Sequence, residues 1–394
     1  MANYKPNIKV PCVYMRGGTS KAVFFHDEDL PQDTKKRNQI ILSAFGSPDP
    51  RQIDGMGGAN TSTSKCAVIK KSNRPGFDVD YDFFQVDLFS PIIGKSMNCG
   101  NISSAVGPYA IDEGLVEAVE PITEVHIFNI NTQKEIIALV PVENGKAVTE
   151  GDYSIDGVPG TGAKILLKFV APQGAVSGKV LPTGHPKDTI EVEGNIYEYS
   201  LVDSSNPLVF VHPEDFGLKG TELPSEFNAL PNCADICRKL EIIRGTCAVT
   251  LGLARDLEDA KVNSQTLPRM VFITRPTDYV AGSGAPISAS EIDLVGRLFS
   301  LNMKMVDAYM GTGSICTVTA ANIPGTIVNE IVNGTEAPSK PVYTVRIGHP
   351  WGIMEAGADL KQEPDGTYSV LSGNLGRTAR RIMEGSVFVR ESIS

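Results

Sequence analysis

Glycine and proline constrain this chain more than any other feature of its sequence. The 394 residues include 38 glycines and 26 prolines, more than the roughly 12% that average usage would give. Neither residue recurs at a fixed period, which excludes a collagen-like fibre. Many short elements joined by tight turns remain as the expected arrangement, and such an arrangement is typical of β-rich proteins.

The overall composition and length indicate a globular protein of two domains, or of three small ones. Hydrophobic residues make up 41% of the chain and charged residues 21%, which excludes disordered and fibrous classes, and the length suits about two domains. The net charge is -10 at pH 7, and no dense stripe of Lys and Arg offsets it. Nucleic acid and anionic membranes are therefore not expected partners.

Cysteine spacing and the N-terminal residues bear on metal binding and on compartment. The seven cysteines show no close double pair of the kind that a zinc ribbon or a disulfide framework needs, so reduced thiols without a metal are expected. Residues 1–9 lack an apolar signal core, and no stretch approaches the ~20 apolar residues that span a bilayer. The cytoplasm is the expected compartment.

Hydrophobic periodicity and turn signals predict an alternation of strands and helices. Helices are expected at residues 34–45, 102–113, 232–244, 289–301 and 315–321. Strands are expected at residues 8–15, 22–26, 67–71, 79–88, 124–129, 135–142, 163–169, 197–203, 208–212, 270–274, 342–347 and 387–390. The Gly- and Pro-rich passage at residues 172–186 is the expected linker.

One local pattern occurs in both halves of the chain. The segment 99–103 precedes a helix of small residues, as 310–314 does, and each has a turn-plus-strand unit upstream, at 18–25 and 204–211. The pattern alone leaves duplication and coincidence as equal alternatives. Small-residue turns that open helices carry unpaired N–H groups, which suit a carboxylate or phosphate, although simple helix capping is the alternative for each turn.

Several polar residues beside these turns are candidates for chemistry. Lys65 opens a strand among apolar neighbours, where desolvation favours a neutral amine that can act as a base; an ordinary surface lysine is the alternative. Cys99 directly precedes a helix N-terminus, which favours a thiolate, and a buried structural cysteine is its alternative. Arg275 and His349 stand at strand ends and could bind a carboxylate or complete a turn.

Six motifs give the chain a resemblance to a known family. They are MRGGTSKAVFF at 15–25, SPDP at 47–50 with QIDGMGGANTSTS at 52–64, NCGNISSAVG at 98–107, GLKGTEL at 217–223, IPGTIVN at 323–329 and GHP at 348–350. In this order they resemble the 2-methylaconitate isomerase family, also called PrpF, over essentially the whole chain.

The resemblance implies an α+β fold of the diaminopimelate epimerase type. Two pseudo-symmetric domains are expected, each a barrel-like sheet around a central helix, with the substrate in the cleft between them. The expected domains are residues 1–186 plus 374–394 and residues 187–373. A homo-oligomer is compatible with this resemblance.

The resemblance also implies an isomerase that needs no cofactor. Such an enzyme removes a proton beside an activated carboxylate of a small unsaturated carboxylate and returns it elsewhere on the conjugated system. Lys65 corresponds to the proton-transfer lysine and Cys99 to the active-site cysteine. The residues expected to bind substrate, from the turns and strand ends above, are Arg16, Thr19, Ser20, Ser64, Gly100, Asn101, Ile102, Ser103, Arg275, Met310, Gly311, Thr312, Gly313, Ser314, Ile315 and His349. Backbone N–H groups at 100–103 and 312–315 are expected to meet the developing negative charge.

Two departures from the family pattern narrow the activity. Met310 stands where the second half of an epimerase would place a cysteine, which argues against a symmetric two-thiol racemase and favours an allylic proton shift. Trp351 adds apolar bulk to the turn after His349, so 3-methylitaconate, interconverted with 2,3-dimethylmaleate, is preferred to 2-methylaconitate. A racemase or epimerase of amino or hydroxy acids and a non-catalytic polycarboxylate-binding protein are the alternatives.

Overall fold

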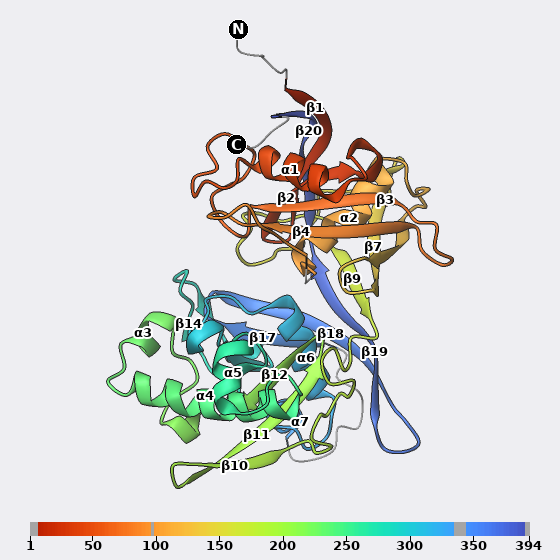
Figure 1. Ribbon diagram of the computed structural model, residues 1–394. Helices are drawn as coiled ribbons and strands as arrows, with labels where there is room; N and C mark the ends of the chain where they lie inside the picture. The colour runs from red at the N-terminus through yellow and green to blue at the C-terminus, as the bar shows by residue number, and fades with distance from the viewer. Residues whose placement is uncertain (1–6, 96–97, 335–343, 391–394) are drawn as a thin grey trace. The chain divides into compact units, whose positions relative to one another are not determined.

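A computed structural model describes residues 7–95, 98–334 and 344–390 of the chain (Figure 1). The contacts between residues divide the chain into two compact units, Met1–Val170 with Gly376–Ser394 and Ala171–Leu375. The boundaries expected from the sequence are different, at 186/187 and 373/374. At the first boundary, where the chain passes from the first unit to the second, the difference has a clear structural reason.

The passage at residues 172–186 is not a free linker, and this part of the sequence prediction is wrong. It is held by β11 (Asn195–Ser204) of the second unit. The Asp203 carboxylate accepts hydrogen bonds from the N–H groups of Val176 and Ser177 at 3.0 and 2.6 Å, and the main chain of Asp203 bonds to Gly174 and Val180. These bonds make the passage part of the second unit.

The first unit, where it is described, is a mixed sheet with two packed helices. Its strands are β1 (Ile8–Gly17), β2 (Ser20–His26), β3 (Lys65–Lys71), β4 (Val79–Val86), β5 (Ile93–Gly94), β6 (Ile122–Asn129), β7 (Lys134–Glu143), β8 (Lys146–Ala147), β9 (Ile165–Val170) and β20 (Ala379–Val389), and its helices are α1 (Thr34–Phe45) and α2 (Gly100–Asp112). A 3-10 turn at Asp27–Asp29 follows β2.

The second unit repeats this construction with a longer helical insertion. Its strands are β10 (Asp188–Val192), β11, β12 (Asn206–Val211), β13 (Arg269–Thr274), β14 (Tyr279–Val280), β15 (Pro286–Ile287), β16 (Leu294–Leu298), β17 (Thr344–His349), β18 (Gly352–Gln362) and β19 (Tyr368–Arg377). Its helices are α3 (Pro224–Asn228), α4 (Cys233–Thr250), α5 (Leu257–Asn263), α6 (Gly311–Ala321) and α7 (Ile327–Asn333). No described helix is both long and apolar enough to span a membrane.

Strand pairing shows that the two units share one topology. In the first unit the hairpin β1–β2 is followed by the parallel pair β2–β3, the antiparallel pair β3–β4, the parallel pair β4–β6 and the antiparallel pair β6–β7. In the second unit β11–β12, β12–β13, β13–β16, β16–β17 and β17–β18 follow with the same directions. The local pattern seen in the sequence is therefore part of a duplication.

Side chains that alternate along the strands of the first unit contact α1 on one face of the sheet and α2 on the other. Cys66, Val68 and Phe84 pack in one buried cluster with Ile41 and Phe45 of α1. Because successive side chains of a strand point to opposite faces, the intervening residues of β3 and β4 face the other helix, α2. The amphipathic helix α1 covers residues 34–45, as the sequence predicts; it is capped by the Asp33 side chain and ends at Gly46.

Helix α2 is the centre of the first unit. It is buried from Ile102 to Ile111, and it contacts strands from across the sheet, including β1, β2, β3, β6, β7, β9 and β20 (Figure 1). Gly107 makes this possible, since a Cβ there would lie 2.7 Å from Val140. The sheet therefore wraps around a central helix, and the α+β fold expected from the sequence is confirmed.

One predicted helix, at residues 289–301, is wrong. The structure has a 3-10 turn at Ala289–Glu291 and then strand β16. The apolar residues recur at helical spacing, but β16 forms hydrogen bonds with β13 on one side and β17 on the other. Pairing on both edges of a buried strand outweighs local helix propensity.

We expect Gly17→Ala to destabilise the protein. A Cβ at this position would lie 2.5 Å from the Asn101 carbonyl oxygen and 3.1 Å from the Ile102 Cα, both main-chain atoms of α2, and such overpacking costs about 1–3 kcal/mol. Gly94→Ala is the matched control, because its Cβ would meet only ordinary contacts at 3.7 Å. Chemical denaturation measures the difference, and equal unfolding free energies for the two variants would contradict it.

Candidate functional site

The hairpin between β1 and β2 lies directly on the first turn of α2. Cβ atoms at Gly17 and Gly18 would lie 2.5 and 2.3 Å from the main chain and side chain of Asn101, and Gly18 has a φ of +51°, so glycine is needed at both positions. Asn101 Nδ2 donates a hydrogen bond to Thr19 Oγ1 at 2.9 Å. This contact fixes the hairpin against the helix N-terminus.

The N-terminal turn of α2 leaves three backbone N–H groups without helix partners. Cys99 is the N-cap residue in an extended conformation, and its carbonyl accepts the Ser103 N–H at 2.9 Å. The Ser103 hydroxyl is also used, since it can donate to Asn98 Oδ1 or Cys99 O. The expectation that Ser103 offers an N–H is therefore wrong, and the unpaired N–H groups belong to residues 100–102, where the helix dipole favours an anion.

Cys99 lies at this turn beside an arginine that the sequence analysis missed. Arg377 is 6% exposed; its Nε donates to Asn101 Oδ1 at 3.3 Å and its Nη1 to the Gly376 carbonyl at 2.8 Å. Burial lowers the pKa of Arg377, and the charge of Cys99 acts in the opposite direction. Cys99 and Arg377 therefore lie within electrostatic range of each other at the start of α2.

Lys65 lies on the face of β3 that points toward α2. The side chain is 9% exposed, and its Nζ lies 5.3 Å from the centre of the Phe83 ring and donates to Gln85 Oε1 at 2.6 Å. Within the part of the chain that the structure describes, no carboxylate pairs with this ammonium group. The Lys65 nitrogen is therefore held by neutral groups alone, an aromatic ring and an amide oxygen.

Gln85 holds this lysine through an amide of fixed orientation. The residue lies opposite Lys65 in the β3–β4 register, and its Nε2 donates to the carbonyl oxygens of Thr61 and Ser64, both at 3.0 Å. Because both acceptors face the amide nitrogen, Oε1 must point toward Lys65. The sequence did not single out Gln85, because the same strand also carries Asp80 and Asp82.

The α2-facing side of β4 connects the two catalytic candidates. Tyr81 and Phe83 share this side with Gln85, and the two rings are 6.5 Å apart. Tyr81 is fully buried, and burial together with the charge of Cys99 raises its pKa. Lys65 thus lies beside Phe83 on this face, and Tyr81 of the same strand lies within electrostatic range of Cys99.

Three other predicted residues of the first unit serve internal contacts. Arg16 Nη1 donates to the carbonyls of Gly18 and Thr378 at 3.0 and 2.9 Å, and the buried Ser64 hydroxyl donates to Gln52 Oε1 at 2.7 Å. Ser20 is 3% exposed. These residues shape the hairpin and the loop before Lys65, whereas Thr19, Cys99 and residues 100–102 come together at the helix N-terminus.

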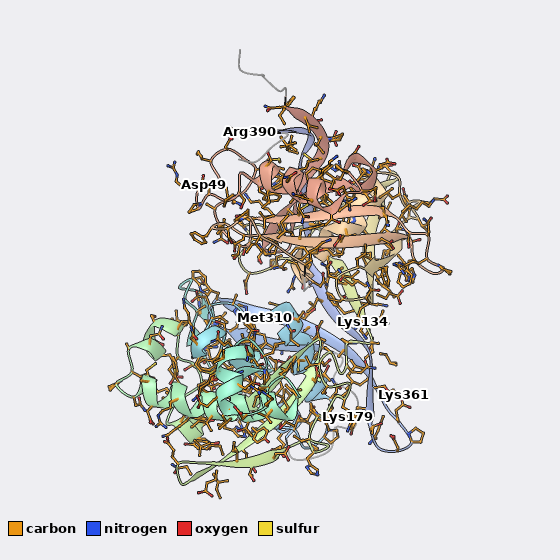
Figure 2. The ribbon with its side chains drawn as sticks, viewed as in Figure 1. Asp49, Lys134, Lys179, Met310, Lys361 and Arg390 are labelled. Carbon is orange, nitrogen blue, oxygen red and sulfur yellow. The ribbon has the colours of Figure 1, made fainter. Side chains whose placement is uncertain are left out.

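In the second unit, α6 opens with the same geometry as α2. Met310, labelled in Figure 2, is its N-cap residue, and its carbonyl accepts the Ser314 N–H at 2.8 Å. The unpaired N–H groups therefore belong to residues 311–313, and the expectation of 312–315 is wrong because Ser314 and Ile315 lie past the first turn. Asn206 Nδ2 donates to Thr312 Oγ1 at 2.7 Å, which reproduces the Asn101–Thr19 contact with donor and acceptor elements exchanged.

Arg275 and His349 do not join this turn by any described contact. Arg275 is exposed, and its carbonyl accepts the Thr277 hydroxyl at 3.0 Å. His349 is 2% exposed; its Nδ1 accepts the Trp351 N–H at 3.2 Å and its carbonyl the Tyr279 hydroxyl at 2.7 Å. Both residues complete turns. No three His, Cys, Asp or Glu side chains among the described residues are placed to hold a metal ion.

Comparison with known proteins identifies the family. The sequence model of the PrpF protein family matches residues 7–390. The chain belongs to the PrpF family. Among its relatives, 3-methylitaconate isomerase of Eubacterium barkeri is 46% identical over 386 residues, covering 98% of both chains, and 2-methyl-aconitate isomerase of Shewanella oneidensis is 38% identical over 400 residues, again with 98% of each chain covered.

A solved structure confirms the fold of this PrpF protein. The crystal structure of methylitaconate-delta-isomerase superposes with a TM-score of 0.89 at 45% sequence identity and covers 98% of this chain and 96% of that chain. The resemblance stated from the sequence motifs is therefore confirmed for the family and for the fold.

We expect Cys99 to react more readily than the five cysteines whose thiol pKa is raised by burial. It is partly exposed at a helix N-terminus near Arg377, whereas burial raises the pKa of the thiols of Cys12, Cys66, Cys237, Cys247 and Cys316. Iodoacetamide labelling followed by peptide mass spectrometry should show Cys99 modified at least about tenfold faster than these five. Earlier modification of any of them would contradict the assignment.

Proposed function

We propose that this protein is a cofactor-independent isomerase that shifts a carbon–carbon double bond in a small methyl-branched unsaturated carboxylate. The preferred substrate is 3-methylitaconate, interconverted with 2,3-dimethylmaleate, and 2-methylaconitate is second. The observation that carries the proposal is Lys65, a 9% exposed amine held by a neutral amide, on the sheet face that leads to Cys99. The higher identity to the 3-methylitaconate isomerase supports the order of substrates.

The proposed reaction moves one proton and leaves the substrate composition unchanged. Lys65 Nζ, as the neutral amine, takes a proton from the allylic carbon, and the electron pair of that C–H bond enters the conjugated system to give a dienolate. The ammonium then returns the proton to the other end of the same system. The N–H groups of residues 100–102 stabilise the developing negative charge, which is the largest contribution in many such reactions.

Cys99 supports this proton transfer from the helix N-terminus. Its thiol or thiolate orients the substrate or acts as the partner acid. The N–H groups of residues 311–313 in the second unit are suited to a carboxylate in the same way as those of residues 100–102.

A racemase with one thiol in each half is disfavoured. Met310 stands at the N-cap position that corresponds to Cys99, and a thioether has no proton to give or take. The non-catalytic alternative, a polycarboxylate-binding protein, is separated from the isomerase by solvent exchange. In deuterated buffer, proton NMR should show loss of a specific methyl or methylene signal of 3-methylitaconate or 2-methylaconitate. The isomerase would be contradicted if deuterium entered none of these acids, nor oxalomesaconate, nor any member of a panel of amino acids.

We expect Lys65→Ala to lower kcat by about 10²–10⁴-fold, the usual contribution of a general base. Deuterium exchange into the substrate should fall in parallel, because both require removal of the same proton. Lys21→Ala is the matched control, since Lys21 is a cation of the neighbouring strand β2 whose Nζ lies over the Tyr14 ring. Near-normal turnover by Lys65→Ala, measured by NMR, would show that another group removes the proton.

Gln85→Glu should move the pH profile of the reaction to higher pH. A carboxylate in place of the amide oxygen that now lies 2.6 Å from Lys65 Nζ stabilises the ammonium form, so more alkaline solution is needed to obtain the neutral amine. The acid-side midpoint of kcat/KM against pH should therefore rise. Gln85→Leu removes the acceptor without adding charge and should not raise that midpoint. If the pH profile of Gln85→Glu were unchanged, residue 85 would not influence the group that removes the proton.

A further inference from the structure

The duplication places an arginine where the first unit has Lys65. In the first unit the parallel pair β2–β3 sets Ala22 opposite Lys65. In the second unit the parallel pair β12–β13 sets Leu208 opposite Arg269. Ala22 and Leu208 hold the same place in their strands after the hairpin, and Lys65 and Arg269 are each the first residue of the next strand. The two residues are therefore equivalent by register.

Packing shows that Arg269 projects toward α6, as Lys65 projects toward α2. Met270 and Phe272 of β13 lie in the buried cluster formed with α4, so alternation turns Arg269 to the opposite face. On that face the neighbouring Leu208 reaches α6, because a Cβ on Gly313 would lie 3.7 Å from its side chain. Gly313 belongs to the N-terminal turn of α6, which carries the unpaired N–H groups.

The guanidinium of Arg269 is partly buried, and its Nε lacks a protein partner. Its Nε is buried and makes no hydrogen bond within the described residues, and none of the described carboxylates pairs with it. Burial alone lowers its pKa. Burying a charged donor without a partner costs stability, so a residue of this kind is expected to serve a ligand.

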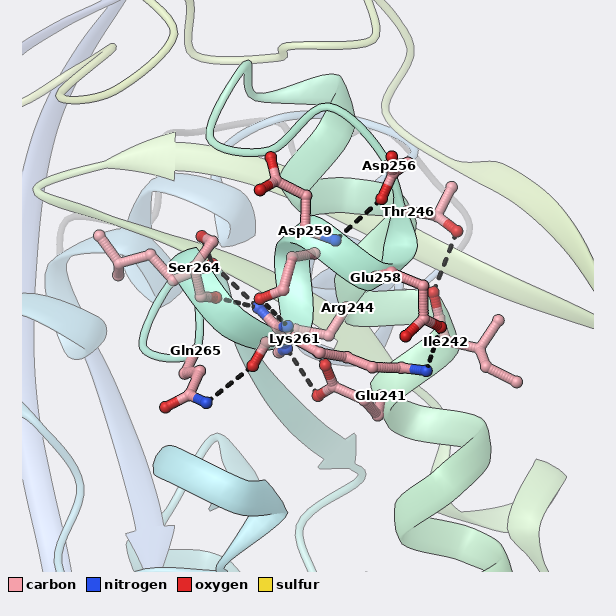
Figure 3. Close-up of polar contacts among 12 residues, drawn as sticks. Glu241, Ile242, Arg244, Thr246, Asp256, Glu258, Asp259, Lys261, Ser264 and Gln265 are labelled. Carbon is pink, nitrogen blue, oxygen red and sulfur yellow. Dashed lines mark hydrogen bonds and ion pairs between the residues drawn. The ribbon is translucent and has the colours of Figure 1, made fainter.

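Arg244, in the same unit, shows what a structural buried arginine looks like here. It is 1% exposed, and Figure 3 shows its guanidinium among side-chain and main-chain oxygens that accept its hydrogen bonds. Its acceptors are the Glu241 carboxylate and the carbonyls of Ala260, Ser264 and Leu267. Arg269 has no such set, which distinguishes it from an arginine that serves the fold.

We propose that Arg269 binds a carboxylate group of the substrate, so that the second unit has a binding group at the position where the first unit has Lys65. This inference rests on the proposed isomerase function. A guanidinium matches a carboxylate with two parallel hydrogen bonds, and it does not release its proton at working pH. Arg269 gives the second unit a group that can bind the negative charge of a substrate. Because Met310 stands where the first unit has Cys99, this unit has no acid or base at either position.

The test measures binding separately from turnover. Arg269→Met should raise KM for 3-methylitaconate about 10- to 100-fold, the range for a lost charge-assisted bond, while kcat changes by less than about threefold. The dissociation constant of succinate, a dicarboxylate with no double bond to move, should rise by a similar factor in calorimetry. Arg269→Lys keeps the charge and should recover part of both losses, and Arg255→Met, at an exposed arginine, should change neither value.

Stability provides the readout that separates a binding role from a structural one. Removing an unpartnered buried charge should leave Tm unchanged or raise it, and a fall in Tm with unchanged KM would overturn the inference. Unchanged succinate affinity in Arg269→Met would overturn it as well. Failure of the proposed function is distinguishable, because it would appear as full activity of Lys65→Ala while Arg269→Met still weakened succinate binding.

Discussion

The buried helix α2 is the constraint on which the first unit depends. Its residues are apolar and enclosed by strands, so the helix has no solvent-exposed face of its own along most of its length. Its first turn, however, cannot pair its own N–H groups, and the glycine hairpin above it supplies no carbonyl to residues 100–102. The fold thus exposes an electropositive helix end, and the hairpin, Cys99 and Arg377 are all placed by contact with that end.

Duplication followed by divergence explains how the units differ in chemistry. Both have a hairpin, a parallel crossover and a central helix in the same order, and in both an asparagine–threonine hydrogen bond fixes the helix start. Lys65 and Cys99 of the first unit correspond in position to Arg269 and Met310 of the second. The second unit thus keeps the N-terminal turn of its central helix and has neither a lysine nor a cysteine at these two positions.

Much of the fold was predictable because the signals were local. The ends of α1 follow from Asp33 and Gly46, and most strands follow from runs of β-branched and aromatic residues. β16 was misassigned since its apolar residues fit a helix equally well, and only its two hydrogen-bonded neighbours decide the outcome. The strands β18 and β19, which were not predicted, are mixed in polarity and rich in glycine.

For the site, the sequence predicted the groups that lie at helix and strand starts. Lys65, Cys99, Thr19 and Asn101 are recognisable from the small-residue turns beside them. Gln85 and Arg377 could not be found in this way, because their roles depend on pairing across strands far apart in the chain. Ser103, Ser314 and Ile315 were assigned free N–H groups although they lie past the first turn of their helices, which only the cap geometry reveals.

The anchoring of Gln85 has a consequence for the loop at residues 52–64. Its two acceptors are main-chain carbonyls, so the lysine's partner responds to the path of that loop rather than to its side chains. The loop therefore tolerates only substitutions that leave its main-chain path unchanged; a Cβ at Gly55, for example, would lie 2.1 Å from Gly46 N. A change of loop length would displace these carbonyls and move the Gln85 amide that holds Lys65. The position of the lysine could therefore change although no side chain in contact with it is replaced.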